Sequence, residues 1–206
     1  QPLNAARIYA TSLSEQTRVN QEQKVGQIGK LADNVDASLE AVEDILTALL
    51  DISRLDAGAM KAELGALRLE DIFRQLAIEF EPLARSKSLE LKFIKSSLSV
   101  RSDRRLLRRL LQNFVSNAIK YTPSGRVLVG ARRRPDGRVR IEVWDTGLGI
   151  PEESRADVFR EFARLESAQR SAPGLGLGLS IVERLARVLE ADLGLRSSVG
   201  SGSVFF

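Results

Sequence analysis

The chain has 206 residues, of which 43% are hydrophobic, and it carries a formal net charge of +4. It contains no cysteine, which fits a reducing, cytoplasmic setting, and no histidine, so zinc sites built on these two residue types are excluded. Because no apolar run reaches about 18 residues, we expect no membrane-spanning segment and no membrane contact by this chain.

The first part of the chain, residues 1–66, is expected to form two antiparallel helices. The first helix is expected from Pro2 to about Ser14, and the polar stretch Ser14–Lys24 connects it to the second. The second helix is expected to end at Gly58. Apolar residues of the second helix recur in heptad-like steps at Ile28, Leu31, Val35, Leu39, Val42, Ile45, Leu49, Ile52 and Leu55. Because two helices cannot close a core alone, we expect the hairpin to pair with a second copy into a four-helix bundle.

From Leu67 the sequence predicts a second domain, residues 67–206, in which short strands mix with helices. Strands are expected at Leu67–Leu69, Leu89–Lys95, Arg126–Arg134, Arg138–Asp145, Asp192–Arg196 and Ser203–Phe206. Helices are expected at Glu70–Ser86, Arg104–Tyr121 and Leu179–Leu189, with a short one near Glu153–Arg160. The turn Pro135–Gly137 between two apolar runs indicates a β-hairpin. This mixture indicates an α+β fold, with one sheet covered by helices on one face.

The positive charge lies in this second domain, since residues 1–63 hold six Lys or Arg against ten Asp or Glu. A basic half can indicate nucleic-acid binding, but no basic helix with interleaved aromatic residues accompanies it here. We therefore expect mostly solvated arginines and no nucleic-acid partner.

Two asparagines distinguish the helix expected at Arg104–Tyr121. Asn113 and Asn117 lie four residues apart and so share one face of an otherwise apolar helix, where amides are costly to bury without partners. An amide oxygen suits Mg²⁺, and Lys120, next to Tyr121 at the helix end, can meet a phosphate as a mobile charge. A pair of exposed asparagines is the plainer alternative.

The segment Asp145-Thr-Gly-Leu-Gly directly follows an apolar strand. The Asp145 carboxylate can accept a hydrogen bond from an exocyclic amine, and Gly147 and Gly149 let the backbone approach a flat base closely. An ordinary turn that ends a strand is an equally good explanation of this motif taken alone.

Three alternate glycines stand just ahead of the last expected helix. Gly174, Gly176 and Gly178 free successive backbone N–H groups to face an anion, and the helix N-terminus adds partial positive charge. The pattern is neither a Walker motif nor a Rossmann fingerprint. A flexible linker is the alternative, although the interleaved leucines argue against it.

The order of these motifs resembles the N, first glycine, F and second glycine boxes of sensor histidine kinases. The matching segments are Asn113–Thr122, Asp145–Ile150, Phe159–Phe162 and Gly174–Gly178. Leu49–Gly58 is similar to the end of that family's second dimerisation helix, and Gly200–Phe206 to its last strand. The resemblance covers essentially the whole chain. It implies a Bergerat-type ATP-binding α/β sandwich, preceded by a dimerisation and phosphotransfer hairpin.

The resemblance also implies two bound groups, ATP and Mg²⁺, and roles for particular residues. Asn117 would hold Mg²⁺ through its amide oxygen, and Asn113 would assist at the metal or the phosphates. Lys120 would contact phosphate, Tyr121 would line the nucleotide pocket, and Asp145 would bind the adenine amino group.

The glycines of the resemblance would shape the backbone around the nucleotide. Gly147 and Gly149 would let the chain pass the base. A hinge and phosphate cradle would be formed by Gly174, Gly176 and Gly178. A lid of about Ala163–Pro173 would close beside them, with Phe159 and Phe162 packed beneath it.

The implied reaction transfers the γ-phosphoryl of ATP to a histidine and then to an aspartate of a response-regulator receiver domain. Pro2-Leu3 is similar to the pair that follows the phosphorylated histidine in this family, which places that histidine a few residues before Gln1. We therefore expect a fragment that has no catalytic residue of its own and cannot phosphorylate itself. Gln1–Arg7 also resembles hybrid kinases that carry a receiver domain.

Two other interpretations stay open. One is another ATPase of the gyrase, Hsp90 and mismatch-repair superfamily, although those enzymes use a glutamate as general base where Asn113 stands, and an amide cannot take a proton. The other is a degenerate kinase that serves as a dimeric scaffold. Four intact boxes argue against that, since buried polar side chains without a ligand are costly.

Overall fold

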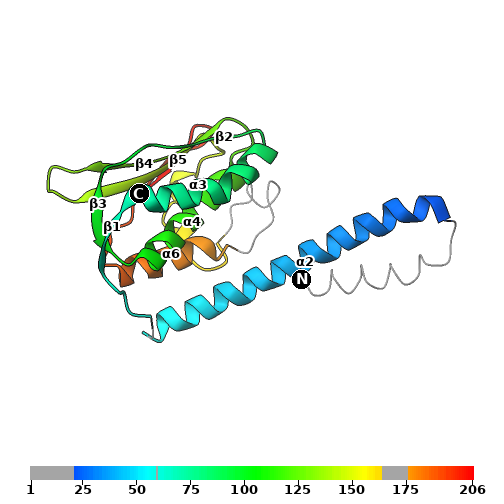
Figure 1. The fold of residues 1–206 in the computed structure, drawn as a ribbon, viewed down its shortest axis with the longest axis horizontal. Helices are drawn as coiled ribbons and strands as arrows, with labels where there is room; N and C mark the ends of the chain where they lie inside the picture. The colour runs from blue at the N-terminus through cyan, green and yellow to red at the C-terminus, as the bar shows by residue number, and fades with distance from the viewer. Residues whose placement is uncertain (1–20, 59, 164–175) are drawn as a thin grey trace. The chain divides into compact units, whose positions relative to one another are not determined.

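The computed structural model describes residues 21–58, 60–163 and 176–206 (Figure 1). None of the helices in these ranges is long and apolar enough to cross a membrane. The chain divides into two compact units, Gln1–Asp51 and Ile52–Phe206. The expected domain boundary at residue 66 stays a prediction.

The first unit holds most of one long helix, α2 (Gln21–Asp56). It starts inside the stretch Ser14–Lys24, so the helix extends into the predicted connection. Leu39 and Leu49, two residues of the predicted seam, are 49% and 45% exposed in the single chain. Pairing with a second copy would cover such residues and stays a prediction. The expected opening helix, Pro2–Ser14, lies outside the described residues.

A five-stranded mixed sheet forms the frame of the second unit. Its spatial order is β2 (Glu90–Phe93), β4 (Arg126–Arg133), β5 (Val139–Asp145), β7 (Gly202–Phe205) and β6 (Leu195–Ser198). β2 pairs with β4 in parallel, and the other neighbours are antiparallel. β4 and β5 form the predicted hairpin, in which Val129 pairs with Val143. Both valines are buried, because alternate residues of each strand face the helical layer.

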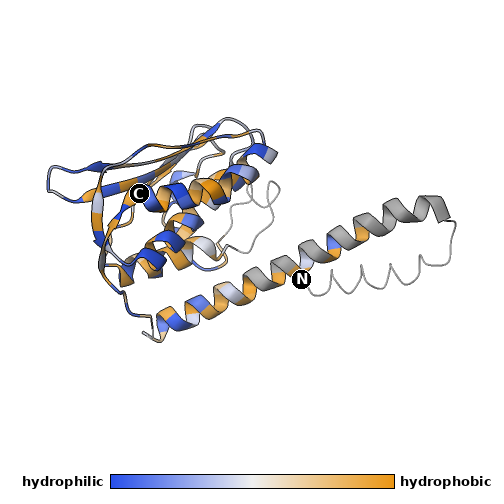
Figure 2. Cartoon of the chain, in the orientation of Figure 1, coloured by the Kyte–Doolittle hydropathy of each residue, from blue (hydrophilic) through white to orange (hydrophobic). Residues whose placement is uncertain are grey.

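Three helices cover one face of this sheet, as the α+β prediction requires (Figure 1). They are α3 (Leu69–Ser86), α4 (Arg104–Tyr121) and α6 (Gly178–Val188). Each has apolar and polar faces (Figure 2), and their buried side chains include Phe73, Leu76 and Val115. Full burial of one such side chain contributes about 1.5–3 kcal/mol, so this layer supplies most of the core's stability.

Several predicted strand boundaries are wrong. β1 (Gly65–Arg68) pairs with β3 (Ser99–Ser102) in a separate two-stranded sheet, whereas the sequence predicted one sheet and no strand at 99–102. β3 carries a single apolar residue, Val100, and therefore lacks the alternation of apolar and polar residues by which a strand is predicted. The strand expected at Asp192–Arg196 starts later, at Leu195, and the Asp192 side chain pairs with Arg138 instead.

The helix ends differ from expectation by a residue or two. α3 begins at Leu69, which the sequence placed in a strand, and α6 begins at Gly178. The short helix predicted near Glu153–Arg160 is two 3₁₀ turns, η1 (Glu152–Ser154) and η2 (Asp157–Phe159).

Candidate functional site

The helix that carries the two predicted asparagines is fixed at its start by a buried carboxylate. Asp103 Oδ1 accepts hydrogen bonds from the backbone N–H groups of Arg105 (2.8 Å) and Leu106 (3.1 Å), and Oδ2 accepts one from Glu63 (2.8 Å). Burial acts to raise the pKa of Asp103, but these three backbone donors outweigh it, and the pKa lies below its usual value. Asp103 thus caps α4 and ties it to the segment ahead of β1.

Asn113 and Asn117 face the first residue of α6. A Cβ added to Gly178 would stand 2.9 Å from Asn113 Oδ1 and 3.7 Å from Asn117 Nδ2. Asn113 is held by a hydrogen bond from its Nδ2 to the Arg109 carbonyl (2.9 Å). The half-buried amide of Asn117 has no hydrogen bond within the described residues. The first and last of the predicted motifs therefore meet here.

The N-terminus of α6 beside these amides has no side-chain cap. Leu177 precedes the helix, and its side chain has no acceptor for the N–H groups of the first turn. Uncapped N–H groups and the helix dipole make such an end attractive to anions. Together with the Asn117 amide, the start of α6 places several polar groups beside Gly178.

Asp145 is the last residue of β5 and is held by two backbone donors. Its Oδ1 accepts hydrogen bonds from the N–H groups of Gly147 (2.8 Å) and Ser203 (3.2 Å). Ser203 is available because the β5–β7 register places it opposite Asp145. Burial raises the pKa of Asp145, against the two hydrogen bonds, which lower it. Within the described residues Oδ2 accepts no hydrogen bond.

Gly147 allows the Asp145 segment to pack closely against the C-terminal end of α4. A Cβ there would stand 2.4 Å from the Tyr121 carbonyl oxygen and 3.0 Å from Thr122 Oγ1. The same Tyr121 carbonyl accepts a hydrogen bond from Leu148 N–H (3.2 Å). Only glycine allows this approach, so the first glycine motif lies against the end of the asparagine helix.

Lys120 and Tyr121 lie together at that end of α4. The Lys120 ammonium is 5.4 Å from the centre of the Tyr121 ring, a cation–π contact. Lys87 Nζ donates to the carbonyl oxygens of Ile119 and Lys120 (3.2 Å each), which compensates the negative end of the helix dipole. The structure thus brings together Asn113, Asn117, Lys120, Tyr121, Asp145, Gly147 and Gly178 around the second half of α4.

The remaining motif glycines pack against neighbouring backbone. Gly149 has φ +71°, and a Cβ there would stand 2.0 Å from the Ser198 carbonyl oxygen. Gly176 has φ +75°, and its Cβ would meet the Ala163 carbonyl oxygen at 2.6 Å. Both need glycine for these contacts inside the protein. Their predicted roles toward a nucleotide stay predictions.

Part of the predicted site lies outside the described residues, namely Gly174 and all of the expected lid except Ala163. Of the two predicted packing aromatics, Phe159 contacts Phe205 edge to face at 6.5 Å between ring centres. Phe162 is 61% exposed and has a φ of 59°. Its predicted packing beneath the lid involves residues outside the described ones and stays a prediction.

Sequence reasoning missed two residues that build the site. Asp103 stands immediately before the predicted helix, which is a recognisable capping signal. Ser203 gives no such signal, because it contributes its backbone N–H rather than its side chain. Only the strand register brings that N–H to Asp145.

The chain is similar to known proteins. The model of the family described as histidine kinase-, DNA gyrase B- and HSP90-like ATPase matches residues 102–206. Sensor protein GacS of Pseudomonas syringae pv. syringae is 32% identical over 190 residues, with 88% of this chain and 20% of that protein covered. Virulence sensor protein BvgS of Bordetella bronchiseptica is 34% identical over 213 residues, with 98% and 17% covered. The chain thus spans about a fifth of the length of these relatives.

Two solved structures are similar as well. The crystal structure of full-length ShkA in complex with AMPPNP is 28% identical with a TM-score of 0.75, and the match covers 100% of this chain and 44% of that one. The catalytic domain of histidine kinase ThkA is 27% identical with a TM-score of 0.60, over 69% of this chain and 92% of that one.

Proposed function

Because this chain belongs to the histidine kinase-, DNA gyrase B- and HSP90-like ATPase family, we propose that it is the Mg-ATP-binding core of a sensor histidine kinase. Its relatives GacS and BvgS are sensor proteins, and the similar ThkA domain is a histidine kinase catalytic domain. Within the wider family, these similarities favour the kinase branch over the gyrase and Hsp90 branches.

One observation carries the proposal. Three motifs that are far apart in the sequence meet around the second half of α4: Gly178 contacts Asn113 and Asn117, and Gly147 contacts Tyr121. A surface that only supported dimerisation would not need an unpartnered amide and close backbone approaches at one place.

The residues present fit the two groups that the proposal requires. The Asn117 amide, without a protein partner in the described residues, offers an oxygen of the kind that Mg²⁺ prefers. The uncapped start of α6 offers N–H groups to phosphate, and Asp145 Oδ2 offers an acceptor to an adenine amino group. Bound Mg²⁺ would neutralise charge on the phosphates.

The chain's own contribution to phosphoryl transfer would be placement and charge compensation. Asn113 would orient its neighbour and the phosphates, while Lys120 would meet phosphate as a mobile cation. Asn113 has no capacity to accept a proton, so the site is suited to transfer to an external nucleophile rather than to hydrolysis of ATP.

The acceptor must lie outside these residues, since the chain contains no histidine. We propose a histidine on the completed N-terminal hairpin as acceptor, and a receiver-domain aspartate as the next one. We further propose that the hairpin forms a homodimer and that the core acts in the cytoplasm as part of a longer protein.

Titration of the chain with AMPPNP, with and without Mg²⁺, tests the proposal. We expect saturable binding that requires Mg²⁺. Asn117→Ala should weaken it by about tenfold or more, the value of one lost charge-assisted contact. Asn34→Ala is the matched control, since Asn34 is an exposed amide on α2. Equal binding by the two variants would remove Asn117 from the site, and no binding to the unaltered chain would overturn the proposal.

The kinase branch needs a second assay. The chain should transfer labelled phosphate from ATP to a separately supplied hairpin that carries a histidine, and the label should be acid-labile. Rapid release of inorganic phosphate without any labelled protein would favour an ATPase instead.

A further inference from the structure

The five-stranded sheet has one face that no described helix of the second unit covers (Figure 1). Because side chains alternate along a strand, the register decides which residues lie on that face. Val129 and Val143 pair with each other and are buried beneath the helices, so their neighbours Leu128 and Trp144 lie on the opposite side. We call this side, which also holds Val204 of β7, the open face.

One row of paired residues crosses the open face over all five strands. From β2 to β6 its members are Lys92, Leu128, Trp144, Val204 and Arg196. The three middle residues are apolar, and a cation stands at each end. Trp144 lies on the central strand and is still 46% exposed. Exposed apolar patches with a polar rim mark interaction surfaces, and tryptophan is enriched among the residues that contribute most to binding.

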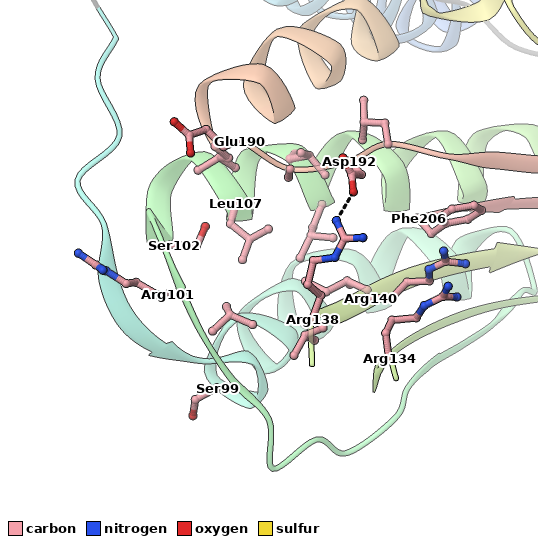
Figure 3. Close-up of a pocket in the computed structure, with 18 of the residues that line it drawn as sticks. Ser99, Arg101, Ser102, Leu107, Arg134, Arg138, Arg140, Glu190, Asp192 and Phe206 are labelled. Atoms are coloured by element: carbon pink, nitrogen blue, oxygen red, sulfur yellow. Dashed lines mark hydrogen bonds and ion pairs between the residues drawn. The ribbon is translucent and has the colours of Figure 1, made fainter. Parts of the chain in front are cut away.

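Two further apolar side chains enlarge this patch. Ile94 is 40% exposed and lies over Gly130 of β4, since a Cβ added to Gly130 would stand 3.5 Å from Ile94 Cγ1. The Phe206 ring lies beside Arg140, with 4.0 Å from its centre to the guanidinium carbon (Figure 3). The same ring is 5.7 Å from the guanidinium of Arg196. Apolar side chains and cations therefore alternate on the open face.

The charge of the open face is positive, with five cations against two carboxylates at its paired positions. Glu142 is already engaged: its carboxylate accepts hydrogen bonds from Arg132 (2.7 Å) and from the Trp144 indole N–H (3.1 Å). The same carboxylate lies 4.0 Å from Arg140. Lys92 and Arg196 are exposed and form no ion pair within the residues that the structure describes. The two ends of the apolar row can therefore receive negative groups.

We infer that the open face binds an acidic protein segment in which apolar side chains lie between carboxylates. Its apolar side chains would cover Trp144 and the aliphatic residues on either side, and its carboxylates would meet Lys92 and Arg196. A nucleic acid fits less well, because bases need several exposed rings for stacking and the neighbours of Trp144 in the row are aliphatic.

This surface is separate from the proposed nucleotide site. Asp145 follows Trp144 in the chain but pairs with the buried Val127, so it lies on the face that the helices cover. The inference therefore does not rest on the proposed function.

Trp144 is the single tryptophan of the chain, so its fluorescence reports on the open face. A synthetic peptide of glutamates with interspersed leucines is titrated into the 206-residue chain. We expect saturable binding that shifts the Trp144 emission to shorter wavelength, protects it from acrylamide quenching and weakens with added salt. No binding by this peptide would overturn the inference.

Two altered peptides separate the contributions of charge and apolar contact. One carries glutamine in place of every glutamate, and the other carries serine in place of every leucine. Each should bind at least about tenfold more weakly, because one loses all ion pairs and the other loses the apolar burial. Equal binding by either altered peptide would contradict the inference.

Two pairs of variants locate the bound peptide, which carries a terminal dye for fluorescence anisotropy. Trp144→Thr, which keeps a residue suited to a strand, should weaken binding at least about tenfold. Ile78→Thr is its control, since Ile78 is 71% exposed on α3. Arg196→Gln should weaken binding about two- to fivefold, the range of an exposed ion pair. Its control is Arg74→Gln, at an exposed position of α3.

Both controls should leave the affinity within about twofold, and thermal unfolding shows whether each variant is folded. Equal effects within either pair would place the peptide elsewhere and overturn the inference. Phosphatidylglycerol vesicles and oligothymidylate test the other classes of partner. Both should bind more weakly than the acidic peptide, because neither alternates carboxylates with apolar side chains. Tighter binding of either one would replace the protein segment by a membrane or a nucleic acid.

Discussion

Gly178, the first residue of α6, stands so close to Asn113 of α4 that a single added methyl group would come within 2.9 Å of the Asn113 amide oxygen. The two residues are 65 positions apart in the sequence. The atom that restricts position 178 belongs to a side chain of the predicted site, and Gly178 has no positive φ of its own. Its role at a nucleotide stays a prediction.

Gly178→Ala should weaken Mg-AMPPNP binding by about tenfold with little change in stability. The new methyl group would push the Asn113 amide away, whereas alanine suits a helix better than glycine by up to about 1 kcal/mol. Calorimetric titration and thermal unfolding measure the two effects. Gly65→Ala is the control, since a Cβ at Gly65 meets nothing within 4 Å. If Gly178→Ala bound Mg-AMPPNP with unchanged affinity, the contact between Gly178 and Asn113 would have no part in nucleotide binding.

Asp145→Asn should reduce affinity for the adenine nucleotide and with it the preference for ATP over GTP. The change replaces an acceptor by a donor, and a charged hydrogen bond contributes about 1.5–3 kcal/mol, or about ten- to a hundredfold in affinity. Titration with AMPPNP and GMPPNP gives both values. Asp157→Asn, at an exposed carboxylate, should change neither. If Asp145→Asn and the unaltered chain bound AMPPNP with equal affinity, the adenine base would not be bound by Asp145.

The same variant should change the pH dependence of stability without nucleotide. Burial raises the pKa of Asp145 above its ordinary value of 3.8. A carboxyl group whose pKa is raised on folding contributes stability that is fully present below pH 3.8 and lost as the pH rises through its folded pKa. The free energy of unfolding of Asp145→Asn, relative to the unaltered chain, should therefore increase with pH across that window. Urea denaturation at several pH values measures it, and a flat or falling difference would contradict the raised pKa.

The glycine pattern shows what a sequence alone can predict. The pairing of Asn113 with Asn117 follows from helix periodicity, and the positions of Asp145 and Gly178 follow from their places at a strand end and a helix start. Tertiary contacts decide the rest. Gly149 is needed because of the Ser198 carbonyl, a neighbour that no local pattern predicts.

The strand β3 could not be predicted from the sequence either. Ser99–Ser102 forms a strand because Val100 pairs with Leu67, a partner more than thirty positions away. Local patterns thus predict elements and motifs, while register and packing decide which residues meet.

Asp103→Ala should lower the free energy of unfolding by about 1–2 kcal/mol, because it removes the cap of α4 and the acceptor of Glu63 N–H. The pKa of Asp103 is lowered on folding, so its contribution is present at neutral pH and lost as the pH falls through its folded pKa. The stability difference between the unaltered chain and Asp103→Ala should shrink below pH 3.8. Urea denaturation measures both effects, with Asp157→Ala, in an exposed 3₁₀ turn, as the control. A difference that is as large in acid as at neutral pH would show that lost packing, and not the capping charge, destabilises the variant.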